Sequence, residues 1–240
     1  MLYASYAEGF RSGGYNSLAG TVEQISKPFL PQYTKAYETG IKTDLFDRTL
    51  RLNLAGFFNK IQNRPQTLVV SSGPAAGTFV VENYDADLKG IEYEVAWRVG
   101  KGLSLWGNGA FNSAKFTSCV TLALTCSVIN NKVPFMPSQL FTVGFDYDTP
   151  LASGKLKFGA DYSKRGDHYS EVLNPEIGHV PSHKFLNAYV RFDRGPWSYQ
   201  LAGKNLTKEE GWNSGFGFSL VQPRFPIEPR SVLATVRYTY

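Results

Sequence analysis

Apolar and polar residues alternate along most of the chain, one residue at a time. In residues 90–99 every odd position is apolar, whereas the even positions include Glu92, Glu94 and Arg98. Successive side chains of a β-strand point to opposite faces, so each such segment has one apolar and one polar face. Helical spacing fits none of these segments for more than one turn, and the alternation therefore predicts about ten strands. The predicted strands span residues 2–11, 34–46, 49–62, 82–99, 103–117, 138–149, 155–169, 183–193, 197–208 and 230–240.

The connections between these strands alternate in length. Short turns containing Gly, Pro or Asp fall at residues 47–48, 100–102, 149–154 and 193–196, where these residue types supply turn geometry. The long connections span residues 12–33, 63–81, 118–137, 170–182 and 209–229. All short turns therefore lie at one end of the sheet, as in outer-membrane barrels, whose strands also have this length. We predict an all-β fold, an antiparallel transmembrane β-barrel.

A soluble sandwich or an up-and-down barrel of the lipocalin kind also alternates in this way. In those folds the apolar face points inward, and the turns need not sort by length to one end. Aromatic residues near the short-turn ends favour the membrane interpretation, because aromatic girdles lie at membrane interfaces. The residues predicted for this girdle are Tyr3, Trp97, Tyr147, Trp197, Tyr199, Tyr238 and Tyr240.

Composition excludes several other classes of protein. The 240 residues are 42% hydrophobic, which is too much for a disordered chain. No apolar run approaches the roughly 18 residues of a transmembrane helix. The net charge is +5, but Lys and Arg are scattered rather than clustered. We therefore expect no nucleic-acid partner.

Four stretches carry a resemblance to a known family. Residues 3–16 (YASYAEGFRSGGYN) contain a Gly-Phe-Arg-x-Gly-Gly signature, and residues 37–45 (YETGIKTDL) resemble the strand that follows it. Residues 88–95 (LKGIEYEV) are similar to a Gly-hydrophobic-Glu strand. Asn205-Leu206, with Pro229-Arg230 and the terminal strand, is similar to the closing pair of the barrel. In this order the stretches resemble the C-terminal part of the barrel of TonB-dependent outer-membrane receptors.

The resemblance implies a barrel of roughly 22 strands filled by an N-terminal plug. Residues 1–240 would be a partial barrel domain that holds the last ten strands, without the plug, the energy-coupling box or a signal peptide, as expected of a truncated reading frame or an excised fragment. The resemblance also implies a transporter in the outer membrane of a Gram-negative bacterium, importing a scarce ligand such as a siderophore–iron chelate or an oligosaccharide. The implied partners are this small-molecule ligand, outer-membrane lipid and lipopolysaccharide, TonB through the missing plug, and the barrel-assembly machinery. We expect no enzymatic activity, cofactor or metal site.

Two smaller features concern assembly and stability. An aromatic C-terminal residue, preceded by apolar residues at alternate positions, resembles the recognition signal of barrel assembly; here these are Val236, Tyr238 and Tyr240. A lipid-facing strand gives the same pattern, and the two interpretations are compatible. Cys119 and Cys126 lie in one long connection. Outside the cytosol such a pair is expected to form a disulfide, because two ligands make no closed zinc site.

Candidate ligand-binding side chains lie in the long connections. His168, His179 and His183 fall near Asp167, Glu171 and Glu176; they are either contacts for a metal chelate or ordinary polar loop residues. Basic residues near the outer rim would attract an anionic ligand or lipopolysaccharide phosphates, or only solvate the surface; they are Arg11, Arg165, Lys208 and Arg224. Aromatic residues of the long connections would bind an aromatic or sugar ligand or pack the loops. They are Phe29, Tyr33, Phe135, Trp212, Phe216, Phe218 and Phe225.

The polar face itself is expected to form a hydrated wall or to contact the plug. The residues assigned to it are Arg51, Glu92, Glu94, Arg98, Asp161 and Arg191. Two alternatives remain for the whole chain: a free-standing ten-stranded pore, or an omptin-like outer-membrane protease with Asp167 and His168 at its rim. A pore of ten strands would have a narrow, mostly filled lumen.

Overall fold

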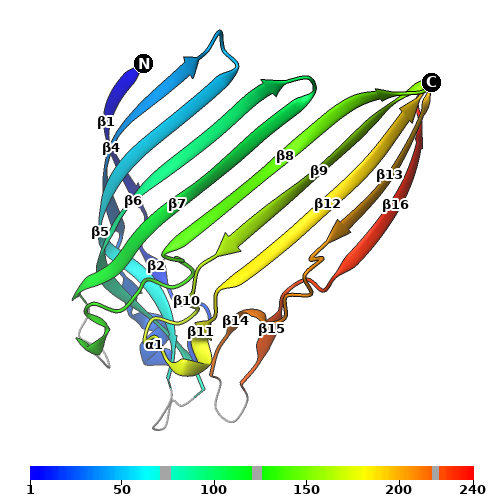
Figure 1. Ribbon diagram of the computed structural model, residues 1–240. Coiled ribbons are helices and arrows are strands. Elements are labelled where there is room, and N and C mark those ends of the chain that lie inside the picture. The colour runs from blue at the N-terminus through cyan, green and yellow to red at the C-terminus, as the bar shows by residue number, and fades with distance from the viewer. Residues whose placement is uncertain (71–76, 121–125, 218–221) are drawn as a thin grey trace.

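The computed structural model describes residues 1–70, 77–120, 126–217 and 222–240. Ten antiparallel strands form one sheet in the order β1-β4-β5-β6-β7-β8-β9-β12-β13-β16, which confirms the predicted strand number (Figure 1). These strands are β1 (Leu2–Arg11), β4 (Gln32–Leu45), β5 (Leu50–Val69), β6 (Phe79–Gly100), β7 (Leu103–Cys119), β8 (Gln139–Leu151), β9 (Gly154–Arg165), β12 (His183–Arg194), β13 (Trp197–Lys204) and β16 (Ser231–Tyr238). Each pairs with the next one along the chain, so the sheet is a meander.

The short turns all lie at one end of the sheet, as predicted, and the long connections lie at the other (Figure 1). Tight turns demand unusual backbone angles. Phe46, Asp47 and Arg48 have φ values of 50°, 52° and 64° in the β4–β5 turn, and Gly195 has 55° in the β12–β13 turn. Asp and Gly tolerate this left-handed region better than most residues, which explains their use in these turns.

The register places the apolar alternate positions of all ten strands on one face of the sheet. Large apolar side chains on this face are exposed: Ile91 by 51%, Val143 by 45% and Leu201 by 50%. An apolar surface of this extent suits contact with lipid, and it argues against the soluble barrel, in which the apolar face is internal.

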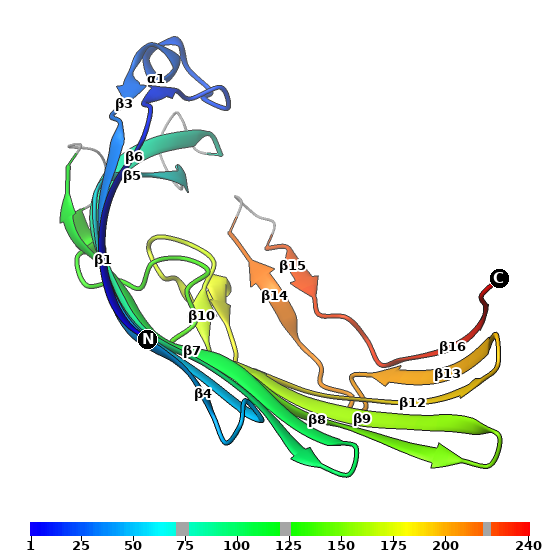
Figure 2. The ribbon, with the colours of Figure 1, turned by 90° about the horizontal axis from the view of Figure 1, so that it is seen from above.

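The opposite, polar face lines the concave side of the curved sheet. Seen from above, the sheet bends around the hairpins of the long connections (Figure 2). Tyr84 and Ala86, which alternate in step with Glu92 and Glu94 along β6, pack against residues of these connections. The buried cluster that results contains Tyr84, Ala86, Ala114, Phe116, Val128, Val133 and Val172. Polar side chains therefore point into the space that a closed barrel would enclose.

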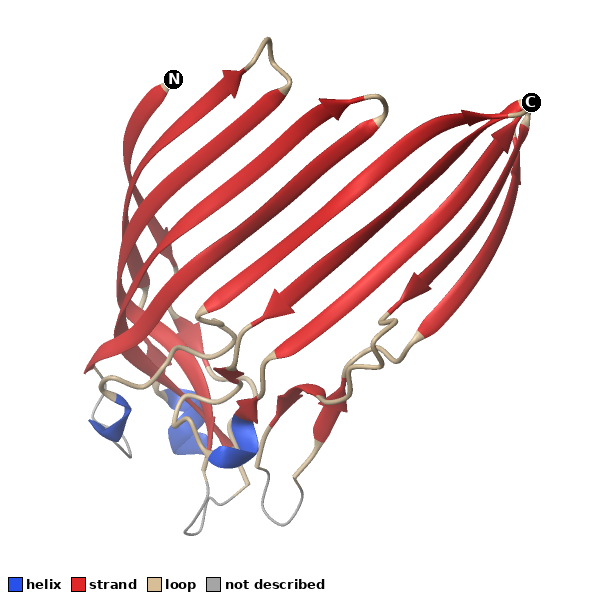
Figure 3. Ribbon diagram, in the orientation of Figure 1, coloured by secondary structure: helices blue, strands red, loops and turns tan. Residues whose placement is uncertain are grey.

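The long connections contain short elements that the sequence did not predict (Figure 3). They are β2 (Gly14–Tyr15), α1 (Val22–Ser26), β3 (Pro28–Phe29), η1 (Cys126–Val128), β10 (His168–Tyr169), η2 (Glu176–Gly178), β11 (His179–Val180), β14 (Trp212–Gly215) and β15 (Arg224–Pro226). β2 pairs with β3, β10 with β11 and β14 with β15. Throughout the described residues, no helix has the length and apolar character needed to cross a membrane.

Several strand ends differ from the predicted ones. β5 and β6 extend well beyond residues 49–62 and 82–99 at the loop end, where they continue to pair with each other. β13 ends at Lys204 rather than at 208, because Asn205 adopts a φ of 48° and leaves the ladder. The predicted strand 155–169 ends at Arg165, and His168 and Tyr169 belong to a separate hairpin.

The two outermost strands are not paired with each other. β1 and β16 are the edges of an open sheet, and every residue of β16 is exposed. In a bilayer, unpaired backbone groups along a strand edge are strongly unfavourable. The sheet of these 240 residues is therefore part of a barrel wall and not a closed ten-stranded barrel.

Candidate functional site

Polar side chains on the concave face form hydrogen bonds across neighbouring strands. Arg51 Nε lies 2.9 Å from Asp44 Oδ1, and Asn53 Nδ2 donates to Glu94 Oε2 at 2.8 Å. The register places all six residues predicted for this face on it: Arg51, Glu92, Glu94, Arg98, Asp161 and Arg191. At these two places the wall presents paired charges and amides.

Two aromatic side chains on this face share one carboxylate, and the group they form extends over β7, β8, β9 and β12. Asp146 on β8 accepts hydrogen bonds from Trp106 Nε1 on β7 at 2.9 Å and from the Tyr189 hydroxyl on β12 at 2.6 Å. Tyr189 reaches across β9 because Gly159 has no side chain there; a Cβ at Gly159 would lie 2.8 Å from the Tyr189 ring. Charge-assisted bonds of this kind fix both rings against the wall.

A hollow of about 460 Å³ lies in the wall nearer the short turns, with Glu38, Lys42, Glu92 and Glu94 among its lining residues. Tyr3 also lines it, and its hydroxyl donates to Glu38 Oε1 at 2.6 Å. The assignment of Tyr3 to the aromatic girdle is therefore wrong: this residue faces the concave side, because it pairs with Gly40 in step with the polar positions of β4.

Three long connections are tied to one another at the other end. We call the described residues 126–137, 166–182, 209–217 and 222–229 the outer cap. Lys132 Nζ lies 2.8 Å from Asp167 Oδ2, and Asn131 Nδ2 donates to the carbonyl of Val172 at 3.0 Å. These contacts join the first two connections.

The second and third connections are joined by backbone and side-chain contacts. Trp212 Nε1 donates to the carbonyl of His179 at 2.9 Å, and the amide of Gly217 donates to Glu171 Oε1 at 3.0 Å. The Ser170 hydroxyl donates to the carbonyl of Gly215. The cap therefore packs as one body over the outer end of the concave face.

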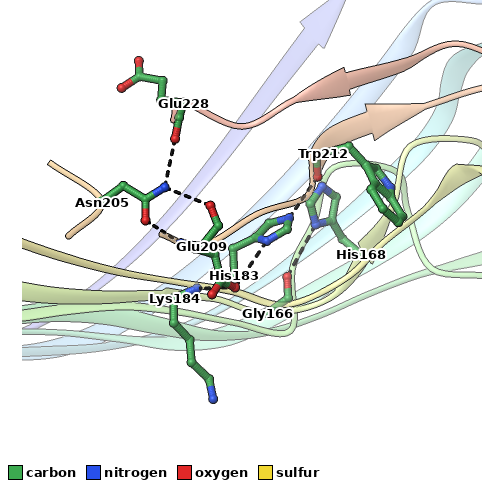
Figure 4. A network of polar contacts seen from close by, with 8 residues as sticks. All are labelled: Gly166, His168, His183, Lys184, Asn205, Glu209, Trp212 and Glu228. Carbon is green, nitrogen blue, oxygen red and sulfur yellow. Dashed lines mark hydrogen bonds and ion pairs between the residues drawn. The ribbon is translucent and has the colours of Figure 1, made fainter. Parts of the chain in front are cut away.

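Figure 4 shows how the cap is attached to the sheet. Asn205, which is buried, donates from Nδ2 to the carbonyls of Glu209 and Glu228 and accepts the amide of Glu209 at 2.7 Å. His183 Nε2 lies 2.9 Å from the carbonyl of Trp212, and its Nδ1 lies 3.6 Å from Glu209 Oε1. Because a carbonyl oxygen only accepts, Nε2 carries a proton.

Ionisable groups of the cap respond to these surroundings. The hydrogen bond from Lys132 holds the pKa of Asp167 below its ordinary value. Burial lowers the pKa of His168 and raises the pKa of Glu171. Each shift follows from local contacts: an ion pair favours the carboxylate, whereas burial disfavours the charged form of either group.

Among the described residues, the three histidines are not part of a group that could hold a metal ion. His168 and His183 are buried, with His168 Nδ1 3.5 Å from the carbonyl of Gly166, whereas His179 Nε2 lies 3.9 Å from Asp167. No group of three or more His, Cys, Asp or Glu side chains is placed to hold a metal ion within the part of the chain that the structure describes. His183 instead joins the sheet to the cap through its contacts with Trp212 and Glu209.

The predicted rim residues are dispersed rather than gathered in one patch. Arg224 lies over the Trp212 ring at 3.9 Å, a cation–π contact, and Phe216 stacks on Phe225 at 6.0 Å. Phe135 packs near the ring of His168. Phe218 lies outside the described residues. Phe135, Trp212, Phe216 and Phe225 therefore make contacts within the cap, although Phe135 and Phe225 are still 54% and 51% exposed.

Two predictions about other residues stay predictions. Cys119 ends β7, but the side chain of Cys126 lies outside the described part of the structure, so the structure does not test the predicted disulfide. Val236 and Tyr238 lie on the apolar face of β16, and the rings of Tyr238 and Tyr240 are 5.2 Å apart. This geometry fits both a lipid-facing strand and an assembly signal.

Sequence reasoning missed Arg64. Its position in β5 is in step with Leu50, Leu52 and Leu54 of the apolar face. A β-bulge turns it to the concave face, because Arg64 pairs with Tyr84 after a register shift. The signal available in the sequence was weak: Asn63, the residue before it, is a type that tolerates the positive φ of 56° found there.

The fold and its two faces define the wall of an outer-membrane β-barrel. The family model "TonB dependent receptor-like, beta-barrel" matches residues 1–206. The chain therefore belongs to the TonB-dependent receptor β-barrel family, whose members are transporters in the outer membrane of Gram-negative bacteria.

Individual relatives agree with this assignment. The pesticin receptor of Yersinia enterocolitica is 29% identical over 136 residues, 57% of this chain and 18% of that protein. The metal-pseudopaline receptor CntO of Pseudomonas aeruginosa is 26% identical over 129 residues, 54% of this chain and 17% of that protein. The crystal structure of the ferric yersiniabactin uptake receptor FyuA from Yersinia pestis superposes with a TM-score of 0.82 at 20% identity, over 99% of this chain and 34% of that one. The chain thus spans about a third or less of these relatives.

Proposed function

We propose that residues 1–240 are the last ten barrel strands of an energy-coupled outer-membrane receptor that imports a metal chelate of the siderophore type. The concave polar face, covered at its outer end by the cap, carries this proposal. It offers charged and amide groups along the route that a ligand would take through the barrel. The names of FyuA and CntO, which refer to ferric yersiniabactin uptake and to metal-pseudopaline, support a metal chelate as the ligand class.

The remaining strands and the plug would come from outside these residues. The unpaired edges of β1 and β16 support this, since a barrel wall needs strands on both sides. The plug would lie against the concave face and would carry the contact with TonB. The hollow next to Glu38 and Glu92 is a surface on which a plug side chain or loop could rest.

The test is uptake by the full-length receptor. The gene would be expressed in a strain without its own ferric-siderophore receptors, with and without TonB, and supplied with radioactive iron in a set of siderophore chelates. We expect uptake of at least one chelate and its loss without TonB. Uptake of an oligosaccharide but of no metal chelate would contradict the ligand class, and uptake without TonB would contradict energy coupling.

A further inference from the structure

A β-bulge in β5 places an arginine on the concave face near the outer end. Ile61 pairs with Ala86 and Arg64 with Tyr84, so two residues, Gln62 and Asn63, lie opposite one. A bulge of this kind redirects the side chains that follow it. Arg64 therefore faces the same side as Tyr84 and not the lipid.

The bulge is held by several hydrogen bonds. The amide of Asn63 donates to Asp85 Oδ1 at 2.9 Å, and Asn63 Nδ2 donates to the carbonyl of Pro31 at 3.2 Å. Asn83 Nδ2 donates to the carbonyl of Asn63 at 2.7 Å. The second oxygen of Asp85 accepts the Ser118 hydroxyl at 2.7 Å. These contacts fix the direction of Arg64, and they commit the nearest carboxylate in the bulge to other donors.

Arg11 reaches the same place from β1. It pairs with Gln32 on β4, and the last β4–β5 pair is Tyr33 with Gln62. Arg11 is in step with Tyr3 on β1, so it also faces the concave side. Arg11 and Arg64 lie on strands that are two places apart, about 10 Å between backbones, a span that two arginine side chains bridge easily.

The guanidinium of Arg64 lacks a partner of its own. Its Nε is buried and has no hydrogen-bond acceptor, and within the described residues Arg64 makes no ion pair within 4.0 Å. The charge of Arg11 is close enough to act on Arg64 electrostatically. An arginine stays charged in proteins, so this half-buried guanidinium carries a positive charge that no carboxylate of the described residues neutralises.

Few acidic side chains share this part of the concave face. Along β4 the nearest is Glu38, six residues from Gln32 and about 20 Å away. On β6, the buried Glu82 is one position further out on the same face, opposite Gln66. Two guanidinium groups therefore face one carboxylate, which leaves a net positive site.

We propose that Arg64 and Arg11 form an anion-binding subsite on the concave face, which takes a carboxylate of the chelate that the receptor imports. The planar guanidinium donates two parallel hydrogen bonds to a carboxylate, the geometry that this acceptor prefers. Lipopolysaccharide phosphates would not reach the site, because it faces away from lipid. The inference rests on the proposed function and makes it more specific: the imported chelate is anionic.

The test uses iron-free citrate as a probe. Its affinity for the purified full-length receptor would be measured by isothermal titration calorimetry. We expect Arg64→Gln to weaken binding by about tenfold or more, the loss of a charge-assisted bond, and Arg64→Lys to weaken it less. Arg11→Gln, at an exposed position, is expected to act in the same direction without affecting folding.

Arg98→Gln is the matched control. Arg98 lies on the same face at the short-turn end of β6, so it undergoes the same charge change away from the site. Citrate binding that is equal in wild type and Arg64→Gln, or no citrate binding by the wild type, would overturn the subsite. Uptake of ferric chelates without citrate binding would leave the proposed function intact, whereas citrate binding without uptake would overturn that function alone.

Discussion

At the scale of single residues, Asn205 does most to fix the start of the third long connection. One buried side chain satisfies two backbone carbonyls and one amide. Its own positive φ ends β13 and turns the chain toward the cap. An asparagine suits both roles, because it tolerates the left-handed region and both donates and accepts hydrogen bonds.

Replacing Asn205 with Ala should release this connection. Three backbone groups would lose their partner, at a cost of about 3 kcal/mol in local stability. We expect faster amide hydrogen exchange in β14 of the full-length receptor, while the sheet is unchanged. Asn213→Ala, at an exposed position in the same strand, is the control. Equal exchange in both variants would show that other contacts hold the cap.

Glu171 gives the cap a dependence on pH. Because burial raises its folded pKa above the ordinary 4.5, the stability it contributes is full below that value and falls as the pH rises through the folded pKa. Glu171→Gln keeps an oxygen to accept the Gly217 amide but removes the charge. We expect slower cap exchange than wild type at pH 7, corrected for intrinsic rates, and no difference below about pH 4.

The exposed Glu176 in the same connection serves as the control, and Glu176→Gln should change neither rate. If Glu171→Gln accelerated exchange at pH 7, the carboxylate would be a stabilising partner of Gly217, and the effect assigned to burial would be wrong.

At the scale of elements, the bulge in β5 determines which face Arg64 takes. By simple alternation Arg64 would lie on the apolar face, and the bulge turns it to the concave face. Deleting Gln62 alone leaves Arg64 opposite Tyr84 in a regular ladder, so citrate binding should persist. Deleting Gln62 and Asn63 together places Arg64 opposite Asp85, on the apolar face, and binding should be lost. The comparison is made by calorimetry on folded receptors. The idea fails if both deletions bind citrate equally well.

The same element shows what the sequence could and could not predict. Strands such as β4 and β12 were predicted almost to the residue, because one face meets lipid and the alternation is unbroken. The extension of β5, its bulge and the face of Arg64 were not, because they depend on contacts from Pro31, Asn83 and Asp85 that lie elsewhere in the chain. Two-residue strands such as β10 likewise exist only through the cap and have no periodicity of their own.

At the scale of the whole molecule, the open sheet limits what these residues do by themselves. The edges β1 and β16 expose 10 and 8 residues of backbone. We expect the isolated 240-residue chain to give no stable monomeric barrel in detergent and no steady conductance in planar bilayers. The full-length receptor, refolded in parallel, should give a compact barrel that resists denaturation by detergent until heated.

A monomeric, detergent-resistant species of the isolated chain would contradict this expectation and would support the alternative that the chain is a ten-stranded pore. Cleavage of a peptide substrate by such a species would support the alternative that the chain is an omptin-like protease. Neither alternative accounts for the match of residues 1–206 to the receptor family.

The mutual contacts of the outer cap also bear on how such receptors diversify. Lys132, Asp167 and Trp212 come from three separate connections, yet each depends on a group in another one. A change in one connection removes contacts that hold the other two, so substitutions in the three connections are expected to occur together. For engineering, a graft of a single outer loop from another receptor into this wall should fail, while the three loops transferred together retain their shape.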